Sequence, residues 1–466
     1  MNLSAPKRDS FAIRLLRSPL GALIARPWLE PVALYWLHRW FLPLSRLFAA
    51  ARAAHGSANE FESAAALKLG NAARQRLDKT LEEFERRRSQ AGAAEAAWEA
   101  CLFSADDADS GPAQQRAAKI EAGRLNARNR YNQMRLRFAP LCLGRRVPAV
   151  AWEIAKPTES LTDYAQLVRY GADLFEPPDP PPTVRHSRWF EFHGRKEYWL
   201  RFDSPSQRMG DTLTVRVSEP LNTAPLATVI YLHGIAVEAE HWRTTIDPAD
   251  QLCAMGMRVV RPEAPWHGRR VAPGKYGGEK FVATIPQATL DFFSAHVREL
   301  AVLTHWARSI DDAPVGWAGS SLGAHVARLA SIKAVAWPQP LQPDAMLLLA
   351  PCGDLQAAAN YGAMGRLFDS RKGRFAAGWS DDLMHKWYAT IDPLDLPVTN
   401  PERILTVLGS HDNVAPYPAA AALIERLGVP PANRFVWRLG HFGMPLRLLR
   451  DPAPLIRLTE LLAGHP

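Results

Sequence analysis

The sequence predicts an α/β protein: a mainly parallel sheet covered by helices on both faces, preceded by an all-helical region. After residue 183, short β-rich runs alternate with helical runs, whereas the first third shows only helical periodicity. Between them lies the segment 176–183 (EPPDPPPT), whose prolines cannot continue a helix and indicate a stiff linker. We therefore expect two parts, an N-terminal region of residues 1–182 and a C-terminal domain of residues 183–466.

The C-terminal domain contains eight runs that are typical of strands: Arg188–His193, Leu213–Val217, Thr228–Leu232, Arg258–Val260, Val315–Trp317, Met346–Leu349, Ile404–Leu408 and Phe435–Trp437. Helical patterns lie between most of the later runs, around 242–255, 285–309, 321–335, 417–427 and 445–462. Strands that alternate with helices favour a parallel sheet that is buried on both faces.

The net charge of the chain is +9, and its excess of basic residues lies in the N-terminal region. Residues 1–150 carry 24 Lys and Arg against 14 Asp and Glu, whereas residues 151–466 carry 32 against 33. Four widely spaced cysteines suggest neither a disulfide framework nor a zinc site. With no convincing signal peptide and no uncharged apolar run of 18 residues, we expect a cytoplasmic protein.

Aromatic residues are interleaved with arginines near the N-terminus, on proline-broken helical segments. The aromatic residues are Trp28, Tyr35, Trp36, Trp40, Phe41 and Phe48. We favour a helical cap that packs on the C-terminal domain. The alternative is peripheral contact of residues 1–60 with an anionic membrane surface, at the inner face of the membrane. No nucleic-acid-binding motif is present, so a nucleic-acid partner is not expected.

The clearest chemical motif is Gly319-Ser320-Ser321-Leu322-Gly323, which fits G-x-S-x-G with Ser321 at its centre. It follows a strand-like run and opens a helical one, which is the context that a nucleophile on a tight strand-to-helix turn requires. Small residues on either side are needed because this turn is crowded. The Leu322 amide, at the helix N-terminus, is then directed toward a developing oxyanion.

Two later strand-like runs end in an acid and a base. Asp412 follows Ile404–Leu408, and His441 follows Phe435–Trp437. The order Ser321, Asp412, His441 is the nucleophile, acid, base order of an α/β-hydrolase. In such a triad His441 takes the serine proton and later returns it to the leaving group, while Asp412 fixes the tautomer and stabilises the imidazolium.

The run Val229–Ile235 ends in His233-Gly234-Ile235, where this architecture supplies its second oxyanion amide. We assign that amide to Ile235, with Ala236 as the alternative. We expect His233 to be a structural hydrogen-bonding residue rather than a second base.

The C-terminal domain resembles the α/β-hydrolase superfamily through HGI at 233–235, GSSLG at 319–323, SHDNVAP at 410–416 and GHFG at 440–443. With His241-Trp242, the PWHGRR stretch at 265–270 and the elbow SLGAH at 321–325, it is most similar to the family of α/β-hydrolase domain-containing protein 18. Members of that family often have a second glycine after the elbow, where this chain has Ala324. The resemblance implies a serine hydrolase acting on an ester, with a lipid acyl ester as one candidate substrate.

Residues 265–270 should lie at the carboxyl edge of the sheet, near the site. Arg269 and Arg270 are candidates for binding an anionic group, and pairing with acidic neighbours is an equal alternative. The other candidates for substrate contact are His233, Gly234 and His267. His241, His267 and His325 lack the close spacing of metal ligands, so we expect neither a metal nor another cofactor.

Residues 353–400 form an insertion before the strand that leads to Asp412. We expect helical patches at Tyr361–Phe368 and Asp381–Tyr388. Insertions at this place often cap the pocket, and the apolar side chains of this one would suit an apolar substrate: Trp379, Met384, Trp387 and Tyr388. A lid that only covers the core is the alternative.

Together these features predict a serine esterase or lipase-like hydrolase that forms an acyl-Ser321 intermediate. The competing hypothesis is a catalytically silent protein that kept the fold for binding or scaffolding, because fold alone does not establish activity.

Overall fold

The structure is a computed structural model that describes residues 21, 26–104, 111–169, 174–235 and 248–464. It contains a sheet of ten strands in the order β1-β3-β4-β6-β5-β7-β8-β9-β10, with β2 paired to β3. The strands are β1 (Arg185–His186), β2 (Phe190–Phe192), β3 (Arg195–Asp203), β4 (Thr212–Pro220), β5 (Ala227–Leu232), β6 (Met257–Pro262), β7 (Val315–Ser320), β8 (Ala345–Leu349), β9 (Ile404–Gly409) and β10 (Arg434–Trp437).

Strands β5 to β10 are parallel to one another, so their carboxyl ends share one edge of the sheet. Strands β1 to β4 pair antiparallel, and β4 joins the parallel part through β6. This arrangement confirms the predicted α/β class with a mainly parallel sheet. Each of the eight predicted strand runs overlaps an observed strand.

The sequence analysis missed one long strand, β3. Five of its nine residues are charged (Arg195, Lys196, Glu197, Arg201 and Asp203), which disguises its alternating pattern. Tyr198, Leu200 and Phe202 nevertheless point into the main hydrophobic core. Pairing with β4 along its whole length, rather than apolar composition, therefore decides that this segment is a strand.

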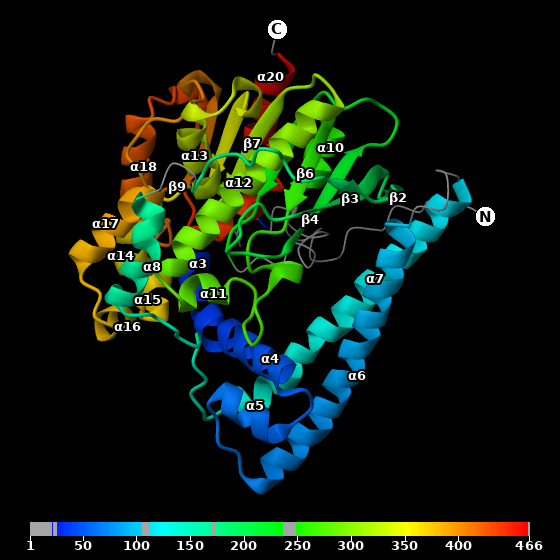
Figure 1. The fold of residues 1–466 in the computed structure, drawn as a ribbon, viewed down its shortest axis with the longest axis vertical. Coiled ribbons are helices and arrows are strands. Elements are labelled where there is room, and N and C mark those ends of the chain that lie inside the picture. The colour runs from blue at the N-terminus through cyan, green and yellow to red at the C-terminus, as the bar shows by residue number, and fades with distance from the viewer. Residues whose placement is uncertain (1–20, 22–25, 105–110, 170–173, 236–247, 465–466) are drawn as a thin grey trace.

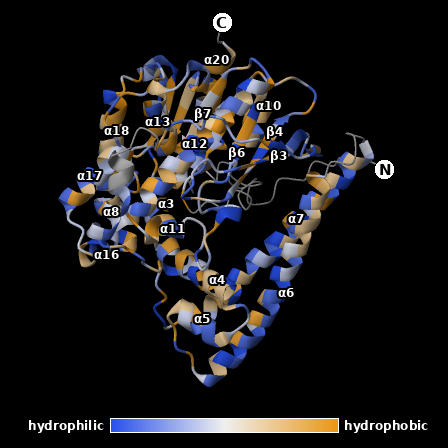
Figure 2. Cartoon of the chain, in the orientation of Figure 1, coloured by the Kyte–Doolittle hydropathy of each residue, from blue (hydrophilic) through white to orange (hydrophobic). Residues whose placement is uncertain are grey.

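Helices cover both faces of the sheet, and each face has its own apolar core (Figure 1). The larger core packs under α12 (Gln287–Ile310), α13 (Leu322–Lys333) and α18 (Tyr417–Arg426). The smaller one packs under α10 (Ala249–Ala254), α19 (Gly443–Leu448) and α20 (Ala453–Ala463). The short helix α11 (Glu279–Ala283) precedes α12. Figure 2 shows the strands mostly in hydrophobic colours between these layers.

The insertion folds as four helices: α14 (Leu355–Tyr361), α15 (Ala363–Phe368), α16 (Ser370–Ala376) and α17 (Asp381–Ile391). The two predicted helical patches fall on α15 and α17. Trp379, Met384, Trp387 and Tyr388 are all buried in the main core. The Trp379 indole donates to Ala155 O at 2.9 Å, and the Trp387 indole donates to Thr289 Oγ1 at 3.2 Å. These four side chains therefore serve packing, which is the alternative reading of the insertion.

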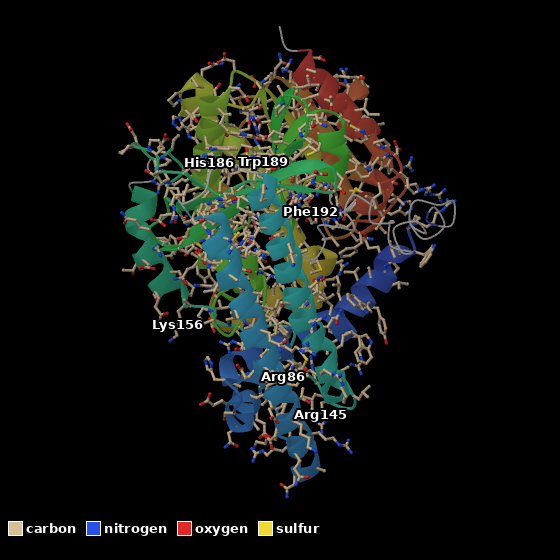
Figure 3. All side chains as sticks on the ribbon, turned by 90° about the vertical axis from the view of Figure 1, so that its right-hand side faces the viewer. Arg86, Arg145, Lys156, His186, Trp189 and Phe192 are labelled. Atoms are coloured by element: carbon tan, nitrogen blue, oxygen red, sulfur yellow. The ribbon has the colours of Figure 1, made fainter. Side chains whose placement is uncertain are left out.

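The described residues of the N-terminal region are mostly helical, with non-helical stretches at 143–156 and 174–182. Its helices are α3 (Leu29–Trp36), η1 (Leu37–Phe41), α4 (Leu42–Ala54), α5 (Ala58–Ala65), α6 (Asn71–Leu102), α7 (Gly111–Gln133), η2 (Met134–Cys142) and α8 (Pro157–Arg169). Helices α6 and α7 pair into a long helical arm, which rises from α4 and α5 and reaches β2 (Figure 1). In Figure 3 the upper part of the arm lies beside the labelled Phe192, while Arg86 lies far down α6.

The end of the arm is joined to the sheet by stacked aromatic and cationic groups. Trp98 of α6 meets Trp199 of β3 edge-on, with ring centroids 5.4 Å apart. The Arg124 guanidinium lies over both rings and binds Glu121 at 2.9 Å. Arg124 and Glu121 are both buried, so their charges depend on each other for solvation.

The base of the arm is attached through α4. Arg46 is buried and binds Glu279, while Tyr276 donates to Ala149 O at 2.8 Å. Phe48 is also buried, in a separate core formed by α4, α5, α6 and η2. Phe48 thus packs within the N-terminal region, whereas Arg46 provides a contact with the C-terminal domain.

Candidate active site

Ser321 lies on the turn between β7 and α13, with φ 53° and ψ −116°. This positive φ is strained for a residue with a side chain. The neighbouring glycines explain how the turn fits. A Cβ on Gly319 would lie 2.3 Å from Gly323 O, and a Cβ on Gly323 would lie 2.2 Å from Leu232 O. Both positions therefore exclude any side chain.

This crowding gives a stability prediction. Gly323→Ala should lower the free energy of unfolding by about 1–3 kcal/mol, because the new methyl group overlaps backbone that cannot move freely. Urea unfolding followed by circular dichroism measures the change. Gly92→Ala is the matched control, since position 92 lies within α6 and has nothing within 4 Å of an added Cβ. That variant should gain about 0.5–1 kcal/mol; equal losses in both would contradict the argument.

Three side chains from three strand ends form a hydrogen-bonded chain. His441 Nε2 lies 2.9 Å from Ser321 Oγ, and His441 Nδ1 lies 2.7 Å from Asp412 Oδ2. Ser321 follows β7, Asp412 follows β9 and His441 follows β10, so the parallel register brings them to one edge. Ser321 and His441 are half-buried, whereas Asp412 is buried.

Asp412 is fixed by its own turn. Its Oδ1 accepts the backbone amides of Val414 at 2.9 Å and Ala415 at 2.8 Å, while Oδ2 faces His441. Amide donors stabilise the ionised form of a carboxyl group. The side chain is thereby held as an acceptor toward the imidazole.

Two opposing effects set the pKa of His441. Burial, the largest single effect, lowers it, but the charge and hydrogen bond of Asp412 and the charge of Glu30 together outweigh burial. The net pKa is raised from the ordinary value of 6.5. An imidazole with this environment favours the protonated state that follows proton transfer from Ser321.

The two expected oxyanion amides lie next to the nucleophile in the chain fold. Leu322 N is the first amide of α13, a position with no acceptor inside the helix. Gly234 follows β5 and passes over the nucleophile, since a Cβ there would lie 3.3 Å from Ser321 Cβ. Ile235 comes next and is half-buried, while Ala236 lies outside the described residues.

His233 fixes the backbone after β5 through two hydrogen bonds of its ring. Its Nε2 accepts the Ala264 amide at 3.1 Å, so the ring proton is on Nδ1, which donates to Gly234 O at 2.8 Å. In a trans peptide the N–H of Ile235 points opposite to the carbonyl of Gly234. Burial keeps the pKa of His233 well below its usual value, so the ring stays neutral. His233 thus orients the backbone, as the structural interpretation expects.

The arginine stretch is engaged by carboxylates. Arg269 binds Glu263 at 2.6 Å and Glu95 of the arm at 2.8 Å. Arg270 is buried and binds Asp211 at 2.8 Å and Glu299 at 2.7 Å. These contacts match the ion-pair alternative, and they tie the loop that follows β6 to both the arm and α12.

Two of the three histidines that were considered as metal ligands lie next to backbone carbonyls instead. His267 Nδ1 lies 2.8 Å from Pro265 O, and His325 Nε2 lies 2.8 Å from Ile391 O at the end of α17. Burial lowers the pKa of His325 to about 4. His241 and Trp242 lie outside the described residues. In the part of the chain that the structure describes, no cluster of three or more His, Cys, Asp or Glu is arranged for a metal ion.

Sequence reasoning missed one residue of the site, Glu30 of α3. Its carboxylate is 2% exposed and accepts the backbone amides of Asn413, at 2.8 Å, and His441. One feature of the sequence could have drawn attention to Glu30: it is the only acidic residue between Asp9 and Glu60, and it lies within the most apolar stretch of the chain.

Comparisons with known proteins find similarity at the level of the fold. The mainly parallel sheet, with Ser321, Asp412 and His441 following β7, β9 and β10, has the architecture of the α/β-hydrolase fold. Among solved structures the chain is similar to acetyl xylan esterase 1 from Thermoanaerobacterium sp. JW/SL YS485, with a TM-score of 0.46 and 16% identity over 64% of this chain and 93% of that one. It is also similar to brefeldin A esterase, a bacterial homologue of human hormone sensitive lipase, with a TM-score of 0.38 and 15% identity over 68% and 88%.

No protein-family model and no curated protein sequence matches the chain. The narrower resemblance to the family of α/β-hydrolase domain-containing protein 18 therefore stays a prediction. Similarity at the level of these solved structures carries no conclusion about activity, which has to be argued from the site itself.

Proposed function

We propose that this protein is a serine hydrolase that cleaves a carboxylic ester through an acyl-Ser321 intermediate. The observation that carries the proposal is the hydrogen-bonded chain from Ser321 Oγ through His441 to Asp412 Oδ2, with distances of 2.9 Å and 2.7 Å. This is the arrangement that activates a serine hydroxyl, because the base contacts the nucleophile and is itself oriented by an acid.

In the proposed reaction, His441 Nε2 takes the Ser321 proton as Oγ attacks the ester carbonyl. The amides of Leu322 and Ile235 stabilise the resulting oxyanion. The imidazolium then protonates the departing alcohol, which leaves an acyl enzyme. Water attacks the acyl group with His441 again acting as base, and the carboxylic acid is released.

The test is covalent labelling with a fluorophosphonate probe, read by intact mass, together with hydrolysis of p-nitrophenyl esters of increasing acyl length. Wild type should gain one probe adduct and release p-nitrophenol, whereas Ser321→Ala should do neither. An unlabelled wild type would instead support the competing hypothesis of a silent binding or scaffolding protein. The acyl-length series reports whether lipid-like chains are accepted.

A second proposal concerns location: we propose that α3 contacts an anionic membrane surface. Four exposed side chains lie on one side of this helix and of the residue before it. Their exposed fractions are 52% for Trp28, 53% for Val32, 67% for Tyr35 and 52% for Trp36. Arg26, which precedes the helix, is exposed as well. Indole and phenol rings beside a cation suit the head-group region of a bilayer. Our proposal is therefore a cytoplasmic protein that binds peripherally at the inner face of a membrane.

No helix in the described ranges is long and apolar enough to span a bilayer. The membrane proposal thus concerns surface binding alone. The full-length protein should co-sediment with vesicles containing phosphatidylglycerol, more weakly at high salt, and less with the double variant Trp28→Ala and Trp36→Ala. Phe375→Ala, an exposed aromatic residue of α16, is the control and should bind as wild type does. Binding to neutral vesicles that is equal and insensitive to salt would contradict the electrostatic part.

A further inference from the structure

We propose that Glu30 is a positioning residue of the active site, so that helix α3 of the N-terminal region completes the catalytic machinery. The proposal rests on the proposed function, because it concerns the same Ser321, His441 and Asp412. It goes beyond that function by assigning a role to a residue 291 positions before the nucleophile in the chain.

Glu30 joins the two segments that carry the acid and the base. One carboxylate oxygen accepts the amide of Asn413, the residue after Asp412, at 2.8 Å. The other oxygen accepts the amide of His441 itself. Since both oxygens act as acceptors, the contact sets the spacing between the loop after β9 and the loop after β10.

The backbone beside Glu30 is shaped to admit it. A Cβ on Gly440 would lie 2.2 Å from Glu30 Oε2 and 2.7 Å from Glu30 Cβ. Only glycine at position 440 therefore lets the carboxylate reach the His441 amide. The first glycine of the GHFG motif thus makes room for Glu30, while the motif's histidine is the candidate base.

Glu30 also places a second carboxylate near the imidazole. The charged groups that face His441 are Asp412 and Glu30, and those that face Glu30 are Asp412 and His441. Burial raises the pKa of Glu30, the two amide donors work to lower it, and the net pKa is raised. The negative charge of Glu30 helps to raise the pKa of His441.

The sign of the expected pH effect follows from these charges. Neutral His441 is the form that accepts the Ser321 proton, so kcat/KM falls as the pH drops through the pKa of His441. Removing the charge of Glu30 removes one cause of the raised pKa. The acid limb of the profile should therefore move to lower pH in Glu30→Gln.

The experiment compares wild type, Glu30→Gln, Glu30→Asp and a matched control. Glu30→Gln should lower kcat by up to about 100-fold, because loop misplacement near the reacting atoms is costly, with KM little changed. Glu30→Asp keeps the charge but is one methylene too short to hold both amides, so it should lower kcat while keeping the acid limb near that of wild type. Glu121→Gln replaces another buried carboxylate, which binds Arg124 of the arm, and should leave kcat and the acid limb unchanged.

A second readout does not need turnover. The proton between His441 Nδ1 and Asp412 gives a strongly deshielded signal in a one-dimensional proton spectrum, identified by its loss in His441→Ala. Its titration should give a lower pKa in Glu30→Gln than in wild type. Wild-type kcat and wild-type titration in folded Glu30→Gln would overturn the proposal, and so would an equal change in Glu121→Gln.

The two proposals fail separately. If the fluorophosphonate leaves wild type unlabelled, the proposed hydrolase function is wrong, yet the titration of His441 still tests Glu30. If Glu30→Gln does not fold, Glu30→Asp carries the test: a kcat equal to that of wild type would then overturn the positioning role.

Discussion

Ser321→Ala is expected to lower kcat for a p-nitrophenyl ester by about 10⁵- to 10⁶-fold, because the triad acts as a unit. Its hydroxyl is the group that His441 Nε2 contacts at 2.9 Å, and alanine offers the ester nothing to form a bond with. His441→Ala should cost about as much, and the double variant should be no worse than either single one.

The neighbouring hydroxyl provides a matched control. Ser320→Ala removes a hydroxyl one position earlier in the chain, and the Ser320 side chain hydrogen-bonds Tyr231 rather than the triad. Its kcat should stay close to that of wild type. Substantial activity in Ser321→Ala, or a comparable loss in Ser320→Ala, would assign the nucleophile elsewhere. Labelling with the fluorophosphonate gives an independent count of reactive serines.

Asp412→Asn is expected to lower kcat by about 10⁴-fold while leaving the protein folded, because the imidazole then takes the wrong tautomer. Asp412 Oδ2 lies 2.7 Å from His441 Nδ1 and accepts a hydrogen bond from its N–H. An amide nitrogen at that place would donate instead and favour the wrong imidazole tautomer. Loss of the negative charge also removes the main cause that raises the pKa of His441.

The control for this variant is a second aspartate that follows the adjacent strand. Asp354 comes after β8 and caps α14, where its Oδ1 accepts the Ala357 amide at 2.7 Å. Asparagine is an equally good cap, so Asp354→Asn should keep both its stability and its kcat. A kcat in Asp412→Asn that matches that of Asp354→Asn would show that Asp412 is not the acid of the triad. Thermal unfolding confirms that the variants are compared as folded proteins.

Local sequence was sufficient for the nucleophile turn because its constraint is local. Gly319 and Gly323 leave no room for a side chain, and Ser321 sits where a strand becomes a helix. The acid and base could be expected for a similar reason, since each directly follows a strand. Parallel strands then bring the residues at their carboxyl ends to one edge without further information.

The missed features are those in which charge pattern and burial disagree. Strand β3 carries charges at alternate and adjacent positions, and its pairing with β4 along its whole length makes it a strand. For Arg269 and Arg270 the sequence left an anionic substrate and acidic neighbours as equal alternatives, and the structure pairs them with Glu263, Glu95, Asp211 and Glu299. Which acid faces which arginine depends on elements far apart in the chain.

The sequence by itself determined the fold class, the order of the candidate triad and the basic character of the N-terminal region. The tertiary structure decided that this region joins the site, because Glu30 finds its partners at Asn413 and His441, which follow it in the chain by 383 and 411 residues. A lone acid in an apolar helix gives no sign of its partner in the sequence. The reason is that a buried carboxylate must be satisfied by whatever donors the fold brings to it, and those donors are backbone amides, which every residue but proline carries.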